Sequence, residues 1–167
     1  PHLITREPGG TPLGEEIREV LLHPGSRHMA PLAELLLYTA SRVQLVRDII
    51  QPALQAGKWV LADRFTDATL AYQGYGRGLD LTRLRELQQW ATGGLQPDLT
   101  VLLDCPVGIA FGRRQDRQAA PDRIEQEDGP FHRRVRDGYL ELAGMEPLRF
   151  LVLDGSRPLD QVMLDFQ

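Results

Sequence analysis

The sequence predicts an α/β fold with a parallel sheet flanked by helices, and two observations support this. Short apolar runs each end in a charged residue, and they are continuous rather than alternating, as expected of strands covered on both faces. Helical patterns of ten or more residues separate these runs, and strands that alternate with such helices form parallel sheets. The expected strands are residues 2–7, 59–63, 99–104 and 150–154.

The first strand is followed by a turn on Pro8-Gly9-Gly10 and then by a helix. Thr11 is expected to cap this helix, with Pro12 at its first position, where a missing N–H costs nothing. Its apolar residues fall on one face, at Leu13, Ile17, Val20 and Leu21.

Further helical patterns fill the intervals between the later strands. A long one runs from Pro31 to about residue 54, and another from Leu81 to about residue 92, where Gly93-Gly94 ends it. Two more helices are expected from residue 106 to about 117 and from 131 to about 143. The polar, helix-poor stretch 115–129 is interpreted as a mobile loop.

Length and composition limit the class of protein. The 167 residues fit one domain, and a net charge of −4 without a basic stripe argues against nucleic-acid binding. No apolar run approaches the ~18 residues of a membrane span. The single cysteine, Cys105, excludes an internal disulfide and suits a reducing compartment, so a cytoplasmic protein is expected.

Three motifs stand at strand ends or shortly after them: Thr5-Arg6-Glu7-Pro8-Gly9-Gly10-Thr11, Asp63-Arg64-Phe65 and Ala71-Tyr72-Gln73-Gly74-Tyr75-Gly76-Arg77-Gly78. Together they closely resemble the bacterial thymidylate kinases, and the resemblance runs from Leu3 to about Val162. It implies the P-loop nucleoside monophosphate kinase fold, transfer of the γ-phosphoryl of ATP onto dTMP with Mg²⁺, and a homodimer. Residues 1–167 would form a single kinase domain, with residues 115–129 as its lid loop.

The acceptor phosphate and the metal would lie at the carboxyl ends of the strands, where open α/β sheets bind ligands. Arg6 and Glu7 end the first strand there. The resemblance gives Asp63 a role in holding Mg²⁺, through water, and gives Arg64 and Arg18 the acceptor phosphate. Arginine suits that role because its planar fork can bond two phosphate oxygens. Taken alone, such residues would be read as surface ion pairs or solvated arginines.

The base and sugar of dTMP would be bound by two helices. By resemblance, Tyr38 stacks on thymine in place of the usual phenylalanine, and Arg42 donates to thymine O4. Thr69 and Gln73 would read the N3–H edge, while Tyr72 would pack where a ribose 2′-hydroxyl would sit. Helical spacing alone would instead make Tyr38 a core aromatic and Arg42 its neighbour.

The resemblance places the ATP-binding arginines in and beside the lid loop and in the turn after the strand expected at residues 150–154. Phosphoryl transfer needs cations over the γ-phosphoryl, and a closing lid can supply them. Arg113 and Arg117 are the candidates for catalysis and ATP binding, with Arg123 as a further ATP contact. Arg157 falls where the family's adenine loop lies. Each of these arginines could equally be a solvated residue.

No GxxxxGK[ST] motif occurs in these residues. In the family that P-loop, with its strand and helix, precedes the position of Leu3, so we expect an upstream strand, loop and helix, and an incomplete sheet without them. Two alternatives stay open. The protein could bind nucleotides without catalysis, or it could phosphorylate another deoxynucleoside monophosphate.

Overall fold

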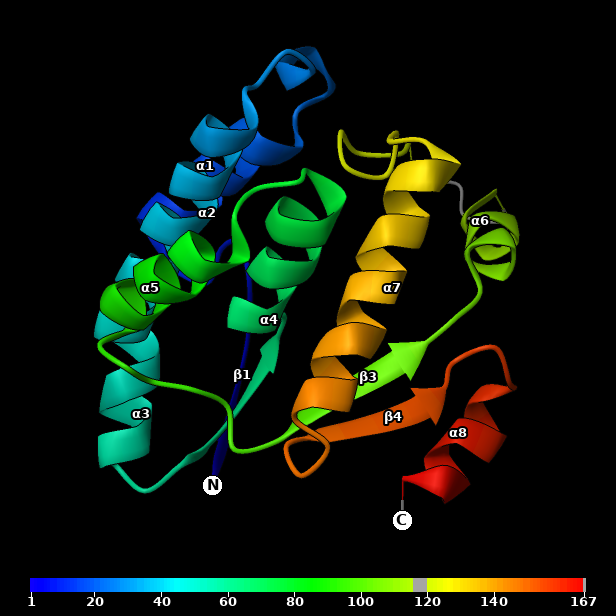
Figure 1. The fold of residues 1–167 in the computed structure, drawn as a ribbon. Coiled ribbons are helices and arrows are strands. Elements are labelled where there is room, and N and C mark those ends of the chain that lie inside the picture. The colour runs from blue at the N-terminus through cyan, green and yellow to red at the C-terminus, as the bar shows by residue number, and fades with distance from the viewer. Residues whose placement is uncertain (116–119, 167) are drawn as a thin grey trace.

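The computed structural model describes residues 1–115 and 120–166 and contains two pairs of parallel strands. β1 (His2–Arg6) pairs with β2 (Trp59–Asp63), and β3 (Thr100–Asp104) pairs with β4 (Phe150–Asp154). Figure 1 shows the β3–β4 pair to one side of the β1–β2 pair, with helices around both. The prediction of an α/β fold with parallel strands flanked by helices is confirmed. Within the described residues, the two pairs are not hydrogen-bonded to each other.

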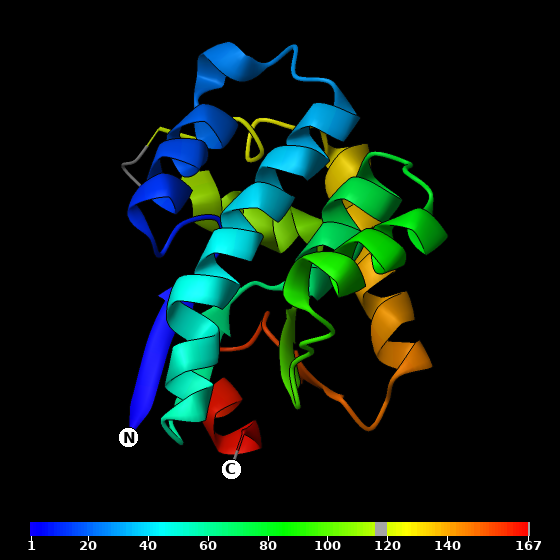
Figure 2. The ribbon, with the colours of Figure 1, turned by 90° about the vertical axis from the view of Figure 1, so that its left-hand side faces the viewer.

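The helices follow the predicted order along the chain. They are α1 (Pro12–Leu22), η1 (Pro24–Ser26), α2 (Pro31–Leu45), η2 (Val46–Ile50), α3 (Gln51–Gln55), α4 (Thr66–Thr69), η3 (Leu70–Gly76), α5 (Leu81–Thr92), α6 (Val107–Gln115), α7 (Gly129–Met145) and α8 (Leu159–Asp165). The long helix expected from Pro31 is continuous through α2, η2 and α3, and Figure 2 shows it as one cyan rod beside β1. η2 and η3 have the wider π-helical hydrogen bonding.

Local sequence signals account for the helix ends. Thr11 Oγ1 accepts from the backbone N–H of Gly14 at 3.0 Å, which caps α1 as predicted. Gly93 ends α5 with a left-handed φ of 64°, a conformation that glycine adopts without strain.

The carboxyl ends of β1 and β2 lie level with each other. Arg6 is the register partner of Asp63, and the N–H of Glu7 donates to the carbonyl of Asp63 at 2.9 Å. This pairing brings the first two predicted motifs to one edge of the β1–β2 pair.

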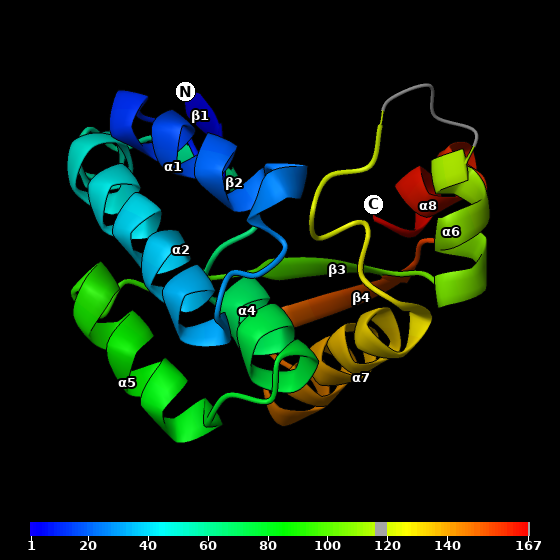
Figure 3. The same cartoon turned by 90° about the horizontal axis from the view of Figure 1, so that it is seen from above.

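The largest apolar cluster lies among α2, η3, α5, α7 and β4. Figure 3 shows the backbone of α2, α5, α7 and β4 from above. The cluster's buried members are Leu35, Leu70, Leu84, Leu142, Ala143 and Phe150. Gly138 lets α7 approach η3 closely, because a Cβ there would lie 2.5 Å from the Tyr75 ring. η3, which carries the third motif, is therefore packed firmly between α2 and α7.

The continuous apolar runs predict strands covered on both faces, and among the described residues one face of the β1–β2 pair is exposed. Ile4, Leu61 and Leu103 are 71%, 54% and 58% exposed. Val60, in contrast, packs against a cluster at the end of α2 and in η2, formed by Leu45, Val46 and Ile50. The β1–β2 pair thus has one face packed on helices, while Ile4 and Leu61 on the other face are open among the described residues. None of the described helices combines the length and hydropathy needed to cross a membrane.

Candidate functional site

A cavity of about 290 Å³ lies at the carboxyl ends of β1 and β2 and is lined by α1, α2, α4, η3, α7 and the segment 122–125. All of the residues predicted to bind the acceptor substrate, together with the predicted metal residue, line it. They are Arg6, Glu7, Arg18, Tyr38, Arg42, Asp63, Arg64, Thr69, Tyr72 and Gln73. Motifs far apart in the sequence therefore meet at one cavity.

The cavity also has lining residues that the sequence reasoning missed: Pro8, Leu22, Ala68, Asp122, Ile124, Glu125 and His132. One signal was available, because Ile124 is an apolar residue within a polar stretch. It is buried against Phe131 and Val135 of α7, which folds the stretch onto the cavity.

The floor of the cavity is a buried ion pair between Arg42 and Glu7, whose residues are 1% and 4% exposed. Arg42 Nε donates to Glu7 Oε2 at 2.8 Å, and its Nη2 donates to Glu7 and to the carbonyl of Phe65. Its Nη1 donates to Thr69 Oγ1 at 2.8 Å and to Gln88 Oε1. All five N–H groups of the guanidinium thus have protein acceptors. A donation from Arg42 to thymine O4 requires that one of these bonds open.

A second buried ionic cluster centres on Glu34, which is 0% exposed and lies one helical turn before Tyr38 on α2. Glu34 accepts from Gln73 Nε2 at 2.8 Å, from Arg77 Nη2 at 3.0 Å and from Arg123 Nη1 at 2.6 Å. Burial acts to raise the pKa of Glu34, but hydrogen bonds from Arg77, Gln73 and Arg123 and the positive charge of Arg77 outweigh it and lower that pKa. Glu34 is therefore ionised at neutral pH.

Arg123, predicted as an ATP contact, lies instead in the protein interior. It is 3% exposed, and its Nε donates to the carbonyl of Leu21 at 2.7 Å while its Nη1 pairs with Glu34. The physical reason is that residues 123–126 form a turn that docks on the end of α1, where the N–H of Arg123 donates to the carbonyl of Leu22. In this position the guanidinium faces protein groups rather than an open surface.

Two other predicted donor-side arginines, Arg113 and Arg157, are not among the residues that line the cavity. Arg113 donates from Nη1 and Nη2 to the carbonyls of Gly155 and Ser156, both at 2.6 Å, beside the turn after β4. Arg157, in the same turn, pairs with Asp165 of α8 at 2.5 Å. Arg113 and Arg157 were both predicted to bind ATP, and both lie at the turn that follows β4. Arg117 lies outside the described residues.

Further arginines converge on the cavity from β1, α1 and the end of β2. Arg6 pairs with Glu15 at 2.9 Å, and Arg18 Nη1 donates to the carbonyl of Pro8 at 2.9 Å. The Arg64 guanidinium lies 4.9 Å from the centre of the Tyr72 ring, in cation–π contact. Arg64 has a φ of 71°, a left-handed conformation that is uncommon outside glycine and that concentrates at functional sites.

Neutral rings complete the lining. Burial and the negative charge of Glu34 raise the pKa of Tyr38 to about 12, so its phenol stays protonated. Burial and the positive charge of Arg114 lower the pKa of His132, which contacts Phe131 edge-on. Among the described residues, no group of three or more His, Cys, Asp or Glu side chains could hold a metal ion by itself.

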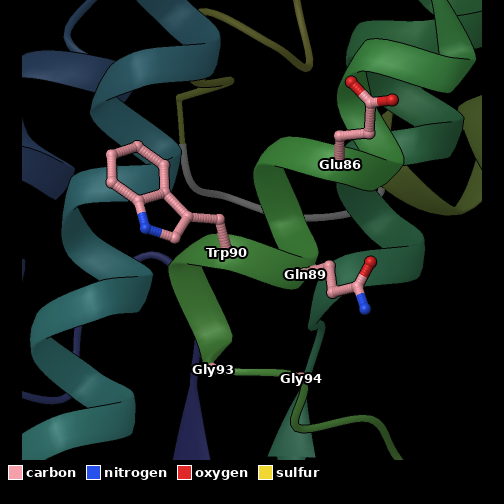
Figure 4. A pocket seen from close by; sticks show the side chains of 5 residues that line it. All are labelled: Glu86, Gln89, Trp90, Gly93 and Gly94. Carbon is pink, nitrogen blue, oxygen red and sulfur yellow. The ribbon is translucent and has the colours of Figure 1, made fainter.

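A second hollow lies at the end of α5 and is open to solvent (Figure 4). It is lined by Glu86, Gln89, Trp90, Gly93 and Gly94, and Trp90 is 84% exposed. None of the predicted site residues contributes to it. The cavity at the end of β1 and β2 is therefore the candidate site.

The family model described as thymidylate kinase matches residues 2–165. The chain is 56% identical to the thymidylate kinase of Deinococcus radiodurans over 159 residues, covering 95% of this chain and 76% of that protein. It is 53% identical to the thymidylate kinase of Geotalea uraniireducens over 164 residues, covering 95% and 77%. The crystal structure of thymidylate kinase from Ehrlichia chaffeensis superposes with a TM-score of 0.76 at 33% identity, covering 99% of this chain and 79% of the other.

Proposed function

The chain belongs to the thymidylate kinase family and phosphorylates dTMP to dTDP with ATP as the donor, and we propose that the cavity at the end of β1 and β2 is its dTMP site. One observation carries the proposal. Every residue to which the family resemblance gave a dTMP contact lines this single cavity. The alternative of a non-catalytic nucleotide binder loses its support, because family membership brings the kinase activity with it.

At the base end of the cavity, Tyr38 stacks on thymine, and Thr69 and Gln73 meet its N3–H edge. Arg42 holds this end in shape through its bonds to Glu7 and Thr69, and it releases one bond to reach thymine O4. Both the ring of Tyr38 and the amide of Gln73 come from helices that pack on each other. The Tyr38 ring and the Gln73 amide are therefore held in position before the base binds, whereas Arg42 must exchange one bond.

At the phosphate end, Arg64 and Arg18 bind the acceptor phosphate, assisted by Arg6, and all three line the cavity. The cation–π contact with Arg64 keeps the Tyr72 ring beside the phosphate site, where it packs against the sugar. Catalysis consists of positioning and charge neutralisation, because phosphoryl transfer requires little covalent chemistry from the protein.

Asp63 would hold Mg²⁺. This exposed carboxylate at the end of β2 fits that ion, which keeps several waters and binds to proteins through one or two carboxylates together with substrate phosphates. When bound, Mg²⁺ neutralises charge on the transferring phosphoryl group. The chain's own part is to fix Asp63 beside Arg6 through the β1–β2 pairing.

The donor side is proposed to be formed by Arg113, Arg117 and the turn that contains Arg157, with residues 115–129 as a lid within a single kinase domain. We further propose that a strand, P-loop and helix preceding Pro1 supply the ATP phosphate site and lie between the two strand pairs. The lack of hydrogen bonds between these pairs and the exposed apolar side chains of β1, β2 and β3 support this arrangement.

The homodimer is proposed to form through the exposed apolar side chains of α1 and α2, two helices that pack on each other. These side chains are Leu13, Val20, Leu32, Leu36 and Val43, each more than 40% exposed. Sedimentation of the full-length protein at micromolar concentration tests this, and a monomer there would contradict it.

The direct test of the function uses purified full-length protein with ATP, Mg²⁺ and dTMP. ADP and dTDP are expected in equal amounts. dUMP, dCMP and dGMP are compared in the same assay, and faster turnover of one of them than of dTMP would show that the acceptor is wrong.

A further inference from the structure

The side-chain amide of Gln73 is held in one orientation by Glu34. Gln73 Nε2 donates to Glu34 Oε1 at 2.8 Å, and the two residues are 2% and 0% exposed. A carboxylate can only accept hydrogen bonds, so the amide must turn its NH₂ group towards Glu34. The carbonyl oxygen of Gln73 has no hydrogen-bond partner among the described residues, and Gln73 lines the cavity.

Glu34 is in turn fixed by cations on two sides. Arg77 donates to it from Nε at 3.1 Å and from Nη2 at 3.0 Å, and Arg123 donates from Nη1 at 2.6 Å. These donors lower the pKa of Glu34 against the effect of its burial. The reverse orientation of the Gln73 amide would set two oxygens against each other, with no proton between them.

We propose that Glu34 sets the base specificity of the site by fixing Gln73 so that its carbonyl oxygen accepts a hydrogen bond from the base. The proposal rests on the proposed function of this cavity as the dTMP site. Thymine carries an N3–H donor, whereas cytosine carries a lone pair at the same position, which would face the oxygen of Gln73. Glu34 itself does not touch the substrate, so it is a positioning residue that selects pyrimidines with a hydrogen on N3.

The test is Glu34→Gln in the full-length protein. A glutamine side chain of the same shape can donate as well as accept, so Gln73 becomes free to turn over. kcat/KM is measured for dTMP and for 5-methyl-dCMP, which differ at the base N3 and position 4 but share the methyl group. The ratio of kcat/KM for dTMP to kcat/KM for 5-methyl-dCMP is expected to fall about tenfold, which corresponds to the loss of one buried hydrogen bond. An unchanged ratio overturns the proposal, because a merely structural role would lower both values alike.

Two further variants separate positioning from general loosening. Glu127→Gln removes the other carboxylate partner of Arg77, at 2.7 Å, in a residue that has no hydrogen bond to Gln73. It should leave the substrate ratio unchanged. In a Gln73→Ala background, Glu34→Gln should cause no additional fall in the ratio. A full fall in that background would show that Glu34 acts by another route and would overturn the proposal.

The variant Glu34→Gln leaves the buried Arg123 without its charge partner, which could prevent folding. In that event the double variant Glu34→Gln/Arg123→Met is compared with Arg123→Met alone, and the kcat/KM ratio should again fall about tenfold. The wild-type protein distinguishes the two proposals. No phosphorylation of dTMP by it would refute the proposed function, whereas an active wild type with an unchanged variant ratio would refute the role of Glu34 alone.

Discussion

Replacement of Arg42 by methionine should destabilise the protein strongly, since Arg42 and Glu7 form a buried pair at the floor of the cavity. The change removes all the hydrogen bonds that the Arg42 guanidinium donates. It also leaves the Glu7 carboxylate buried without a cation. Burial already raises the pKa of Glu7, and the charge and hydrogen bonds of Arg42 oppose it. Breaking such a buried pair typically costs ~3–5 kcal/mol.

The cost should be visible in thermal unfolding of the full-length protein. At roughly 2–4 °C per kcal/mol for a chain of this size, Arg42→Met should lower Tm by about 6–20 °C. Arg47→Met is the matched control, because Arg47 lies in η2, which continues the same helix, and its side chain is 72% exposed. The control should change stability by no more than ~0.5 kcal/mol.

The same variant should also bind dTMP poorly. A base edge left without its donor, and a cavity floor without its anchor, should lower kcat/KM for dTMP by about one to two orders of magnitude at a temperature where the variant is folded. If Arg42→Met unfolds at the temperature of the Arg47→Met control, the buried pair does not hold the floor of the cavity. The double variant Glu7→Gln/Arg42→Met should recover part of the lost stability, since it removes the orphaned charge.

Three further predictions follow from the site. Tyr72→Ala should weaken discrimination between deoxyribonucleotide and ribonucleotide acceptors, measured as the ratio of kcat/KM for dTMP to that for ribothymidine monophosphate; an unchanged ratio would contradict its place beside the sugar. Arg113→Ala frees the carbonyls of Gly155 and Ser156 and should raise KM for ATP more than KM for dTMP, and equal changes would contradict a donor-side role. Folding lowers the pKa of Glu34 from 4.5, so at acidic pH the unfolded state binds more protons than the folded state. The stability that the ionised Glu34 contributes is therefore complete above about pH 4.5 and is lost as the pH falls below that value. The Tm difference between wild type and Glu34→Gln should therefore narrow below about pH 4.5, and a difference independent of pH would contradict an ionised Glu34.

The part of the site that could be predicted from sequence is the part that lies at strand ends and within single helices. Arg6 and Asp63 become neighbours because parallel strands in register end at one edge, which their apolar runs already implied. Tyr38 and Arg42 share a face because they are four residues apart in a helix. Such local rules, with the family resemblance, were enough to bring distant motifs to one cavity.

What could not be predicted depends on contacts between segments far apart in the chain. Arg123 looked like a solvent-facing lid arginine, but the turn that carries it docks on the end of α1 and buries it against Leu21 and Glu34. The docking depends on Ile124 entering an apolar cluster on α7, and no periodicity marks a single isoleucine in a polar stretch. The openness of one face of β1 and β2 likewise follows from which elements surround them, not from the strands' own residues.

Because of where Glu34 lies, α2 both contributes to base recognition and fixes the turn that carries Arg123. Glu34, Tyr38 and Arg42 recur every four residues along α2, so they form one polar line on a helix whose neighbouring residues Leu35 and Leu45 are buried. Each end of that line is an ion pair with a different part of the chain. Arg42 holds the end of β1 through Glu7, and Glu34 holds the 123–126 turn through Arg123. A base seated against Tyr38 therefore lies between two anchors on one rigid element, so its position relative to the phosphate-binding arginines and to the segment above it is set by the pitch of α2.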